Sequence, residues 1–157
     1  MDQSPLRRPP RLERVFTRRT RPLFFLTFCT QDRRRLLDCE EVHAAFVSFA
    51  ALSPERAQVW VGRYVIMPDH LHVFVSAEGS SALQRWVASL KRHLTWTLKA
   101  LGLPSPHWQQ GFFDHLLRSS ESYGEKWAYV EQNPVRAGLV EASATWPFAG
   151  EIERLDF

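Results

Sequence analysis

The sequence predicts an α+β fold in which one antiparallel sheet carries packed helices. Apolar residues make up 45% of the 157 positions and aromatic residues 13%, which is enough to form a buried core. Segments with the two-residue period of strands alternate with segments of helical period. Their order along the chain is β-α-β-β-α-β-α, and this order is typical of a ferredoxin-like α+β sandwich.

The first half of the chain contains two expected strands and one helix. The segment PLFFLTFCT at 22–30 predicts a central strand because it is apolar on both of its faces, Phe24, Leu26 and Phe28 on one and Phe25, Thr27 and Cys29 on the other. A helix is expected at 40–52, where a stripe is formed by Val42, Ala45, Phe46, Phe49 and Ala50. Ser53-Pro54 is expected to end this helix, and residues 57–67 predict the second strand.

The second half begins with a tight turn at Met67-Pro68-Asp69, followed by a strand at 71–77. Ser80 or Ser81 is expected to cap a helix that extends to about Leu101, with a buried stripe of Leu83, Val87, Leu90, Leu94, Leu98 and Leu101. The segment FFDHLLR predicts a short strand. The last helix is expected to start at Ser119 or Ser120 and to stop at Asn133, because Pro134 disfavours the α conformation in the residue before it.

Positive charge is concentrated at the N-terminus. Residues 1–35 contain ten arginines and three acidic residues, whereas residues 36–157 contain ten basic and fourteen acidic residues. We expect a basic, disordered arm at 1–21 and a single folded domain at 22–157. The arm is either a phosphate-binding segment, since guanidinium groups match phosphate geometry, or a solubilising tail.

Other features bear on the location of the protein. No apolar run approaches the length of a membrane span, and the Arg- and Pro-rich N-terminus lacks the apolar region of a secretory signal. Asp2 and Glu13 oppose an organellar transit peptide. Cys29 and Cys39 lack metal-type spacing, so we expect a cytoplasmic protein without membrane association.

The stretch MPDHLHVFVS places His70 and His72 on the same face of a strand. Two imidazoles so placed supply half of a metal site, or they are two unrelated surface histidines. A zinc ion would require a third ligand from Cys, His or a carboxylate. Mg²⁺ or Mn²⁺ would prefer oxygen ligands and leave room for a phosphate.

The last helix contains a candidate nucleophile. Its apolar stripe is Tyr123, Trp127 and Val130, and Tyr129 lies off that stripe. Asn133 is one turn further on and shares the face of Tyr129. This pair could place a nucleophile beside a metal ligand, or it is an ordinary surface tyrosine and a helix-ending asparagine.

These motifs together resemble a known family. MPDHLHVFVS resembles the HUH motif of single-tyrosine transposases, in which U is a hydrophobic residue. WQQGFFDHLLRS, YVEQNPVRAGLV and TWPFAG are similar to later signatures of the REP-associated tyrosine transposases, and the resemblance extends from about Pro22 to Phe148. It implies an HUH endonuclease fold that cleaves and rejoins single-stranded DNA, often beside a hairpin from a repeated extragenic palindrome.

The resemblance also implies roles for individual residues. His70 and His72 match the metal-binding pair, Tyr129 matches the nucleophile, and Asn133 stands where the wider family usually has a glutamine ligand. The implied cofactor is Mg²⁺ or Mn²⁺, and the implied partner is single-stranded DNA with a hairpin, bound by a monomer or homodimer. No P-loop is present, so we expect no nucleotide cofactor. The general base stays open between Asp69, Asp114 and His115.

The expected DNA contacts are mostly arginines, together with the loop tryptophan that we favour for base stacking. They are Arg7, Arg8, Arg11, Arg14, Arg18, Arg19, Arg85, Arg92, Lys99, Trp108 and Arg136. Two other functions remain open. One is a zinc hydrolase that uses His70 and His72 with Asp114 or His115, and the other is a domesticated DNA-binding protein that no longer performs the chemistry.

Overall fold

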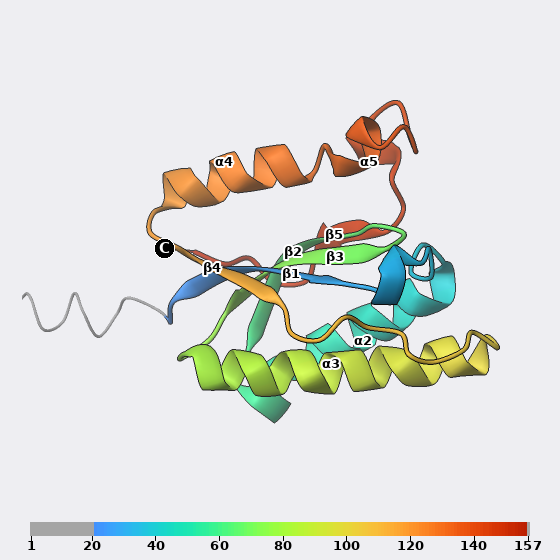
Figure 1. The fold of residues 1–157 in the computed structure, drawn as a ribbon. Helices are drawn as coiled ribbons and strands as arrows, with labels where there is room; N and C mark the ends of the chain where they lie inside the picture. Colours follow the sequence, from blue (N-terminus) through green and yellow to red (C-terminus); the bar gives the residue numbers. More distant parts are fainter. Residues whose placement is uncertain (1–20, 157) are drawn as a thin grey trace, which may run out of the picture.

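The computed structural model describes residues 21–156, in which helices cover both faces of one sheet (Figure 1). Five strands pair antiparallel in the order β4-β1-β3-β2-β5, and they span Leu23–Cys29 (β1), Trp60–Ile66 (β2), His70–Ser76 (β3), Phe113–Leu117 (β4) and Ala149–Glu151 (β5). The helices span Glu40–Ala57 (α2), Ser80–Ala100 (α3), Ser120–Val130 (α4) and Asn133–Arg136 (α5), with 3₁₀ turns at Gln31–Arg33 and Ser143–Thr145. The predicted α+β fold is confirmed. None of the helices within 21–156 has the length and apolarity needed to cross a membrane.

The core lies on both faces of the two central strands, β1 and β3. On one face, Leu26, Leu71 and Val73 join the cluster that packs under α2 and α3. On the other face, Phe25 and Phe74 pack with the apolar side of α4. Because both faces are covered, these strands are apolar at nearly every position, and the predicted alternation of faces in the first strand is confirmed.

The helix α2 continues to Ala57, so the expectation that it ends at Ser53-Pro54 is wrong. Pro54 lies in the last turn of the helix, where its missing N–H removes one intrahelical hydrogen bond. The Ser53 hydroxyl, buried between helices, accepts a 2.9 Å hydrogen bond from Trp86 Nε1 of α3. This contact holds the last turn against α3. The residue after the helix, Gln58, is its C-cap and is in the left-handed conformation (φ 54°).

The helix termini differ from expectation at two other places. The last helix ends at Val130 rather than Asn133, and Asn133 instead begins α5, with Pro134 in the first turn where a proline is well tolerated. Gly79, with no side-chain bond, occupies the N-cap of α3 in place of a serine. The expected cap at Ser119 is confirmed, since its side chain accepts from the backbone N–H of Ser122.

The short edge strand β5 was not predicted. Its three residues are too few to show an alternating pattern. They pair with β2 in the register Arg63↔Glu151, Tyr64↔Gly150 and Val65↔Ala149. The sheet therefore has five strands rather than the four expected from the sequence.

Two glycines are expected to respond in opposite ways to substitution by alanine. A Cβ on Gly150 would lie 2.9 Å from the hydroxyl of Tyr64, which is buried and 2.8 Å from His43 Nε2. A Cβ on Gly124, inside α4, would meet nothing within 4 Å. We expect Gly150→Ala to lower the free energy of unfolding by about 1–3 kcal/mol. Gly124→Ala should raise it by about 0.5–1 kcal/mol. Denaturant unfolding of both variants checks this, and changes of the same sign would contradict it.

Candidate active site

His70 and His72 lie at the start of β3, on the sheet face that α4 covers. Their ring centroids are 4.7 Å apart with an interplanar angle of 80°, so the expected same-face placement is confirmed. The preceding turn is fixed by a 2.8 Å hydrogen bond from the Met67 N–H to the His70 carbonyl. A second constraint comes from Leu36 and Leu37, whose N–H groups both donate to the Pro68 carbonyl.

Each imidazole is oriented through its Nδ1 atom. His70 Nδ1 is 2.7 Å from Asp69 Oδ1, and His72 Nδ1 is 2.7 Å from Thr27 Oγ1. Thr27 reaches His72 because the pairing of β1 with β3 places the two residues directly opposite one another. Among residues 21–156 no hydrogen bond is made to Nε2 of either ring. The Nε2 atoms are therefore the ones available to a ligand.

The surroundings of both histidines favour the neutral form of the ring. Burial lowers the pKa of His70, and the adjacent Asp69 carboxylate opposes this effect. Burial also lowers the pKa of His72, to about 3; protonation of His70 and the nearby cations Lys126, Arg33 and Arg136 would each lower it further. A neutral ring keeps the lone pair that metal binding requires.

Three arginines of the basic N-terminal region make contacts within the fold. Arg33 Nε lies 2.9 Å from Asp69 Oδ2, and its Nη2 is 3.3 Å from His70 Nδ1. Arg34 donates two bonds of 3.1 Å to the Pro104 carbonyl. Arg21 lies over the Trp60 ring at 3.6 Å. The six expected arm contacts, Arg7, Arg8, Arg11, Arg14, Arg18 and Arg19, lie outside the described residues.

Tyr129 and Asn133 are linked by a single arginine. Tyr129 is 63% exposed, as its position off the apolar stripe predicted. The Arg136 guanidinium lies 3.9 Å from the centroid of the Tyr129 ring, and its Nη2 donates a 2.6 Å hydrogen bond to Asn133 Oδ1. These three residues form the tyrosine cluster.

The tyrosine cluster lies within electrostatic reach of the histidine pair. The positive charge of Arg136 is one of those that lower the pKa of His72, after burial as the main cause. Lys126 of α4 lies 4.9 Å from the centroid of Phe25, which in turn stacks on His72 at 5.2 Å. Figure 1 shows the C-terminal end of α4 and α5 above the end of the sheet where β3 begins. The end of α4 that bears Tyr129 and the start of β3 thus lie at the same end of the sheet, although they are more than fifty residues apart in sequence.

The other polar candidates are placed less favourably for a metal site. Asp114 pairs with Leu26, so it points to the face of α2 and α3, away from the histidines. His115 pairs with Phe25 and shares the face of His72. Within the described chain no group of three or more His, Cys, Asp and Glu residues could hold a metal ion. The zinc-hydrolase alternative thus lacks its third ligand in this region.

The expected DNA-contacting residues of the folded part fall into three environments. Trp108 is half-buried, and its Nε1 donates to the Lys91 carbonyl (3.1 Å) and to Thr95 Oγ1 (3.0 Å), so it packs the loop against α3. Arg85, Arg92 and Lys99 are exposed on α3, across the sheet from the histidines. Of the predicted contacts within 21–156, Arg136 alone lies in the tyrosine cluster.

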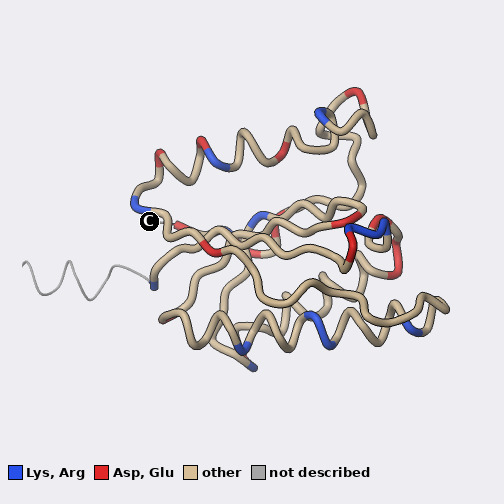
Figure 2. Tube along the Cα trace, viewed as in Figure 1, with Lys and Arg blue, Asp and Glu red and all other residues tan. Residues whose placement is uncertain are grey.

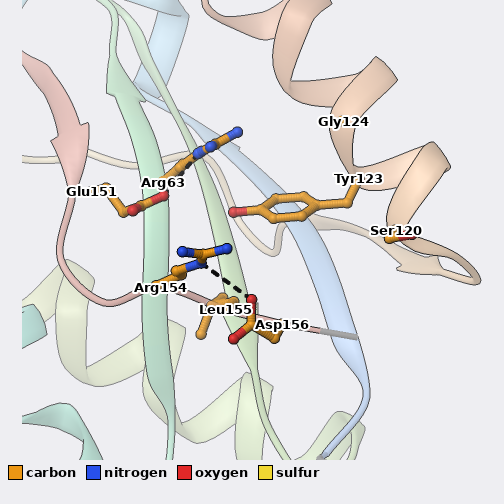
Figure 3. Close-up of a pocket in the computed structure, with 8 residues that line it drawn as sticks. All are labelled: Arg63, Ser120, Tyr123, Gly124, Glu151, Arg154, Leu155 and Asp156. Atoms are coloured by element: carbon orange, nitrogen blue, oxygen red, sulfur yellow. Dashed lines mark hydrogen bonds and ion pairs between the residues drawn. The ribbon is translucent and has the colours of Figure 1, made fainter.

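A separate pocket lies near the N-terminal end of α4 (Figure 3). It has a volume of about 330 Å³ and is lined by Arg63, Ser120, Tyr123, Gly124, Glu151, Arg154, Leu155 and Asp156. Arg63 is paired with Glu151 at 2.8 Å, and Arg154 with Asp156 at 3.3 Å. The pocket is therefore balanced in charge, and it does not include either histidine or Tyr129.

Sequence reasoning missed several residues that surround the histidines. Thr27 and Arg33 orient the two rings, and Lys126 adds positive charge. Phe113 is 77% exposed and pairs with Thr27, so it presents an aromatic ring on the histidine face. The pairing of β1 with β3 and β4 identifies Thr27 and Phe113 as neighbours of the histidines, and a single sequence does not contain that register.

Comparisons with known proteins agree on a family. The model of the family described as "Transposase IS200 like" matches residues 23–133. A Haemophilus influenzae protein named as a REP-associated tyrosine transposase is 26% identical over 138 residues, which cover 81% of this chain and 78% of that protein. The similarity to this branch that the motifs predicted is thus confirmed.

Two solved structures show the same fold. A REP-associated tyrosine transposase bound to a REP hairpin superposes with a TM-score of 0.67 at 23% identity, covering 94% of this chain and 82% of that chain. A protein assigned as a transposase from Deinococcus radiodurans superposes with a TM-score of 0.51 at 17% identity, covering 70% and 88%.

The neutral state of His72 predicts a pH dependence of stability for the metal-free protein. The folded-state pKa of about 3 lies below the ordinary value of 6.5, so the unfolded chain binds more protons below pH 6.5. This contribution to stability is present above pH 6.5 and is lost as the pH falls toward 3. We expect the free energy of unfolding in EDTA to fall more steeply between pH 6 and pH 4 for the wild type than for His72→Gln. An NMR titration midpoint near 6.5 for His72 would contradict the expectation.

Proposed function

The chain belongs to the IS200-like transposase family, and on this basis we propose that it cleaves and rejoins single-stranded DNA through a covalent phosphotyrosine at Tyr129. The observation that carries the proposal is the exposed phenol of Tyr129, which lies against Arg136 at the end of α4 that covers the start of β3, where His70 and His72 lie. A nucleophile, a phosphate-binding cation and a pair of metal ligands are the parts that this reaction needs.

We propose that the cleavage site lies beside a DNA hairpin. The relative solved in complex with a REP hairpin has the same fold over nearly all of this chain, which supports a hairpin substrate here. The signatures WQQGFFDHLLRS and YVEQNPVRAGLV support assignment to the same branch. The hairpin would identify the site, and the adjoining unpaired strand would contact the C-terminal end of α4 and the start of β3.

Cleavage exchanges one phosphodiester for another. The Tyr129 oxygen loses its proton and attacks the scissile phosphorus, and the bond to the 3′ oxygen breaks. The leaving 3′ oxygen takes up one proton to become a free 3′-OH, so protons balance overall. The 5′-phosphate is then joined to Tyr129. Rejoining reverses these steps, with a 3′-OH as the nucleophile and Tyr129 as the leaving group. No nucleotide cofactor is required, because the phosphotyrosine conserves the energy of the bond.

Arg136 is proposed to hold the scissile phosphate beside Tyr129. Its guanidinium is exposed and lies against the ring of the nucleophile, so a phosphate bound to it would be near the attacking oxygen. The bond from Arg136 to Asn133 Oδ1 limits the freedom of the guanidinium. Arg136 would therefore position the substrate rather than transfer protons.

His70 and His72 fit a divalent ion such as Mg²⁺ or Mn²⁺. Both rings are neutral, and Asp69 and Thr27 orient them through Nδ1 so that Nε2 is available. Asn133 Oδ1 already accepts a bond from Arg136, but a carboxamide oxygen has a second lone pair to offer. When bound, the ion would act as a Lewis acid on the scissile phosphate.

The assignment of the nucleophile is tested by Tyr129→Phe. This change removes one exposed hydroxyl, so stability should change by less than about 1 kcal/mol. DNA binding should persist, because phosphate contacts do not depend on that oxygen. The covalent protein–DNA adduct, measured on a denaturing gel with a hairpin oligonucleotide and Mn²⁺, should disappear.

The matched control is Tyr123→Phe. Tyr123 is 9% exposed and packs against Phe74 with ring centroids 4.9 Å apart. A phenylalanine at position 123 should keep this ring packing. This variant should still form the adduct. An active Tyr129→Phe protein, or an adduct mapped by mass spectrometry to Tyr123, would overturn the assignment.

The metal proposal is tested through the residue that orients His72. Thr27→Val removes the oxygen bonded to His72 Nδ1 and keeps the shape of the side chain, so Mn²⁺ affinity measured by calorimetry should fall about 10–100-fold. Thr27→Ser keeps the oxygen and should bind Mn²⁺ nearly as well as the wild type. His72→Ala should abolish both Mn²⁺ binding and cleavage. Undiminished cleavage in EDTA would refute metal dependence.

A further inference from the structure

The helix α3 differs in charge from the rest of the folded body. Its 21 residues include four lysines and arginines and no acidic residue, whereas the remainder of residues 21–156 contains ten basic and fifteen acidic residues. Figure 2 shows Lys and Arg at several positions along α3 with no Asp or Glu between them. A cationic element on an otherwise acidic body indicates an anionic partner.

Three of the cations share one stripe with an exposed tryptophan. At 100° per residue, the directions of Arg85, Arg92, Trp96 and Lys99 fall within an arc of about 60°. We call these four residues the α3 outer stripe. The stripe lies opposite the buried residues Leu83, Leu90 and Leu94, so it faces away from the sheet.

The side chains of the α3 outer stripe are available for binding. Trp96 is 74% exposed, the most open of the tryptophans described. Arg85, Arg92 and Lys99 are all exposed, and within residues 21–156 none of them forms an ion pair. Lys91 of the same helix differs, because its Nζ donates to the carbonyls of Gln109 (3.0 Å) and Gly111 (2.6 Å) and so fixes a loop.

The spacing of the stripe suits unpaired DNA. Arg92 lies about 6 Å before Trp96 along the helix axis, and Lys99 about 4.5 Å after it. An aromatic ring between two cations can stack on one base while the cations contact the phosphates on either side, which is the arrangement that holds single strands without sequence preference. A duplex buries its base faces, so it would leave the indole uncovered.

We propose that the α3 outer stripe is a second DNA-binding surface, which holds unpaired DNA by stacking a base on Trp96 between Arg92 and Lys99. The identity of the ligand as DNA rests on the proposed function. The stripe and the histidine pair lie on opposite sides of the sheet. The stripe therefore binds strand that flanks the site of cleavage, rather than the scissile phosphate itself.

The first test measures affinity for a fluorescein-labelled oligo-dT without a hairpin, using the full chain in EDTA. Trp96→Ala should weaken binding about tenfold, and Trp96→Phe, which keeps an aromatic face, should restore most of the affinity. Leu52→Ala is the matched control, because Leu52 is an exposed apolar residue (40%) on α2 and should bind as the wild type does. Equal affinity of Trp96→Ala and wild type would overturn the proposal, as would an equal loss in Leu52→Ala.

The second test separates phosphate contact from stacking. The Arg92→Ala/Lys99→Ala double variant should reduce the slope of log K against log salt for oligo-dT by about 1.4, since each phosphate contact on single strands contributes about 0.7. Arg154→Ala, which removes an exposed arginine paired with Asp156, should leave the slope unchanged. An unchanged slope in the double variant would overturn the proposal.

A third measurement needs no substitution and so does not depend on the folding of any variant. Near-ultraviolet cross-linking of wild type to a 5-bromodeoxyuridine oligonucleotide should label the tryptic peptide 93–99, which contains Trp96. Labelling elsewhere without this peptide would overturn the proposal. Loss of binding to phosphatidylserine vesicles in Trp96→Ala, with oligo-dT affinity retained, would also overturn it and identify a membrane surface instead.

The outcomes distinguish this proposal from the proposed function. The covalent adduct with a hairpin oligonucleotide tests the chemistry at Tyr129, and oligo-dT binding tests the α3 outer stripe. A wild type that forms no adduct but loses oligo-dT affinity in Trp96→Ala would refute the chemistry and retain the stripe. A wild type that forms the adduct, with Trp96→Ala binding oligo-dT normally, would refute the stripe alone.

Discussion

The pairing of β1 with β3 is the constraint on which the candidate site depends. The two strands lie at the centre of the sheet, and their register places Thr27 opposite His72 and Cys29 opposite His70. A shift of one residue would turn Leu71 and Val73 out of the core and the two histidines into it. Burial of these apolar residues therefore fixes the direction of both imidazoles, and the chemistry of the site follows from the packing on the other face of the same strand.

The same arrangement explains the electrostatics around the histidines. Placing His72 against Phe25 under α4 removes it from water, which is the main reason for its low pKa. Positive charge from Lys126 and Arg136 adds to that effect. The result is a pair of imidazoles that favour the neutral form beside several cations, which suits the proposed binding of a metal ion and a phosphate. These two properties come from one packing arrangement.

Much of this site follows from sequence periodicity, and the remainder does not. Two-residue alternation predicted that His70 and His72 share a face, and helical periodicity predicted that Tyr129 is exposed, because both patterns are local. The contact of Thr27 with His72 and the direction of Asp114 toward the face of α2 and α3 depend on strand register, which joins residues dozens of positions apart. The predicted ends of α2 and α4 were wrong for different reasons. Proline usually ends a helix, but α2 continues past Pro54, where Ser53 contacts Trp86. Pro134 lies in the first turn of the separate helix α5, and α4 ends before it, at Val130.

The strand order β4-β1-β3-β2-β5 has a mechanical consequence for the helix that bears Tyr129. The chain leaves one edge of the sheet at β4, crosses above it as α4 and α5, and rejoins it at the opposite edge as β5. The segment of α4 and α5 is thus attached to the sheet at both ends, by β4 before it and by β5 after it, and Tyr129 lies at the C-terminal end of α4. The attachment through β5 is the shorter one, because β5 has three paired residues and β4 has five. Movement of the Tyr129 end of α4 across the sheet would therefore act first on the three residue pairs of β5.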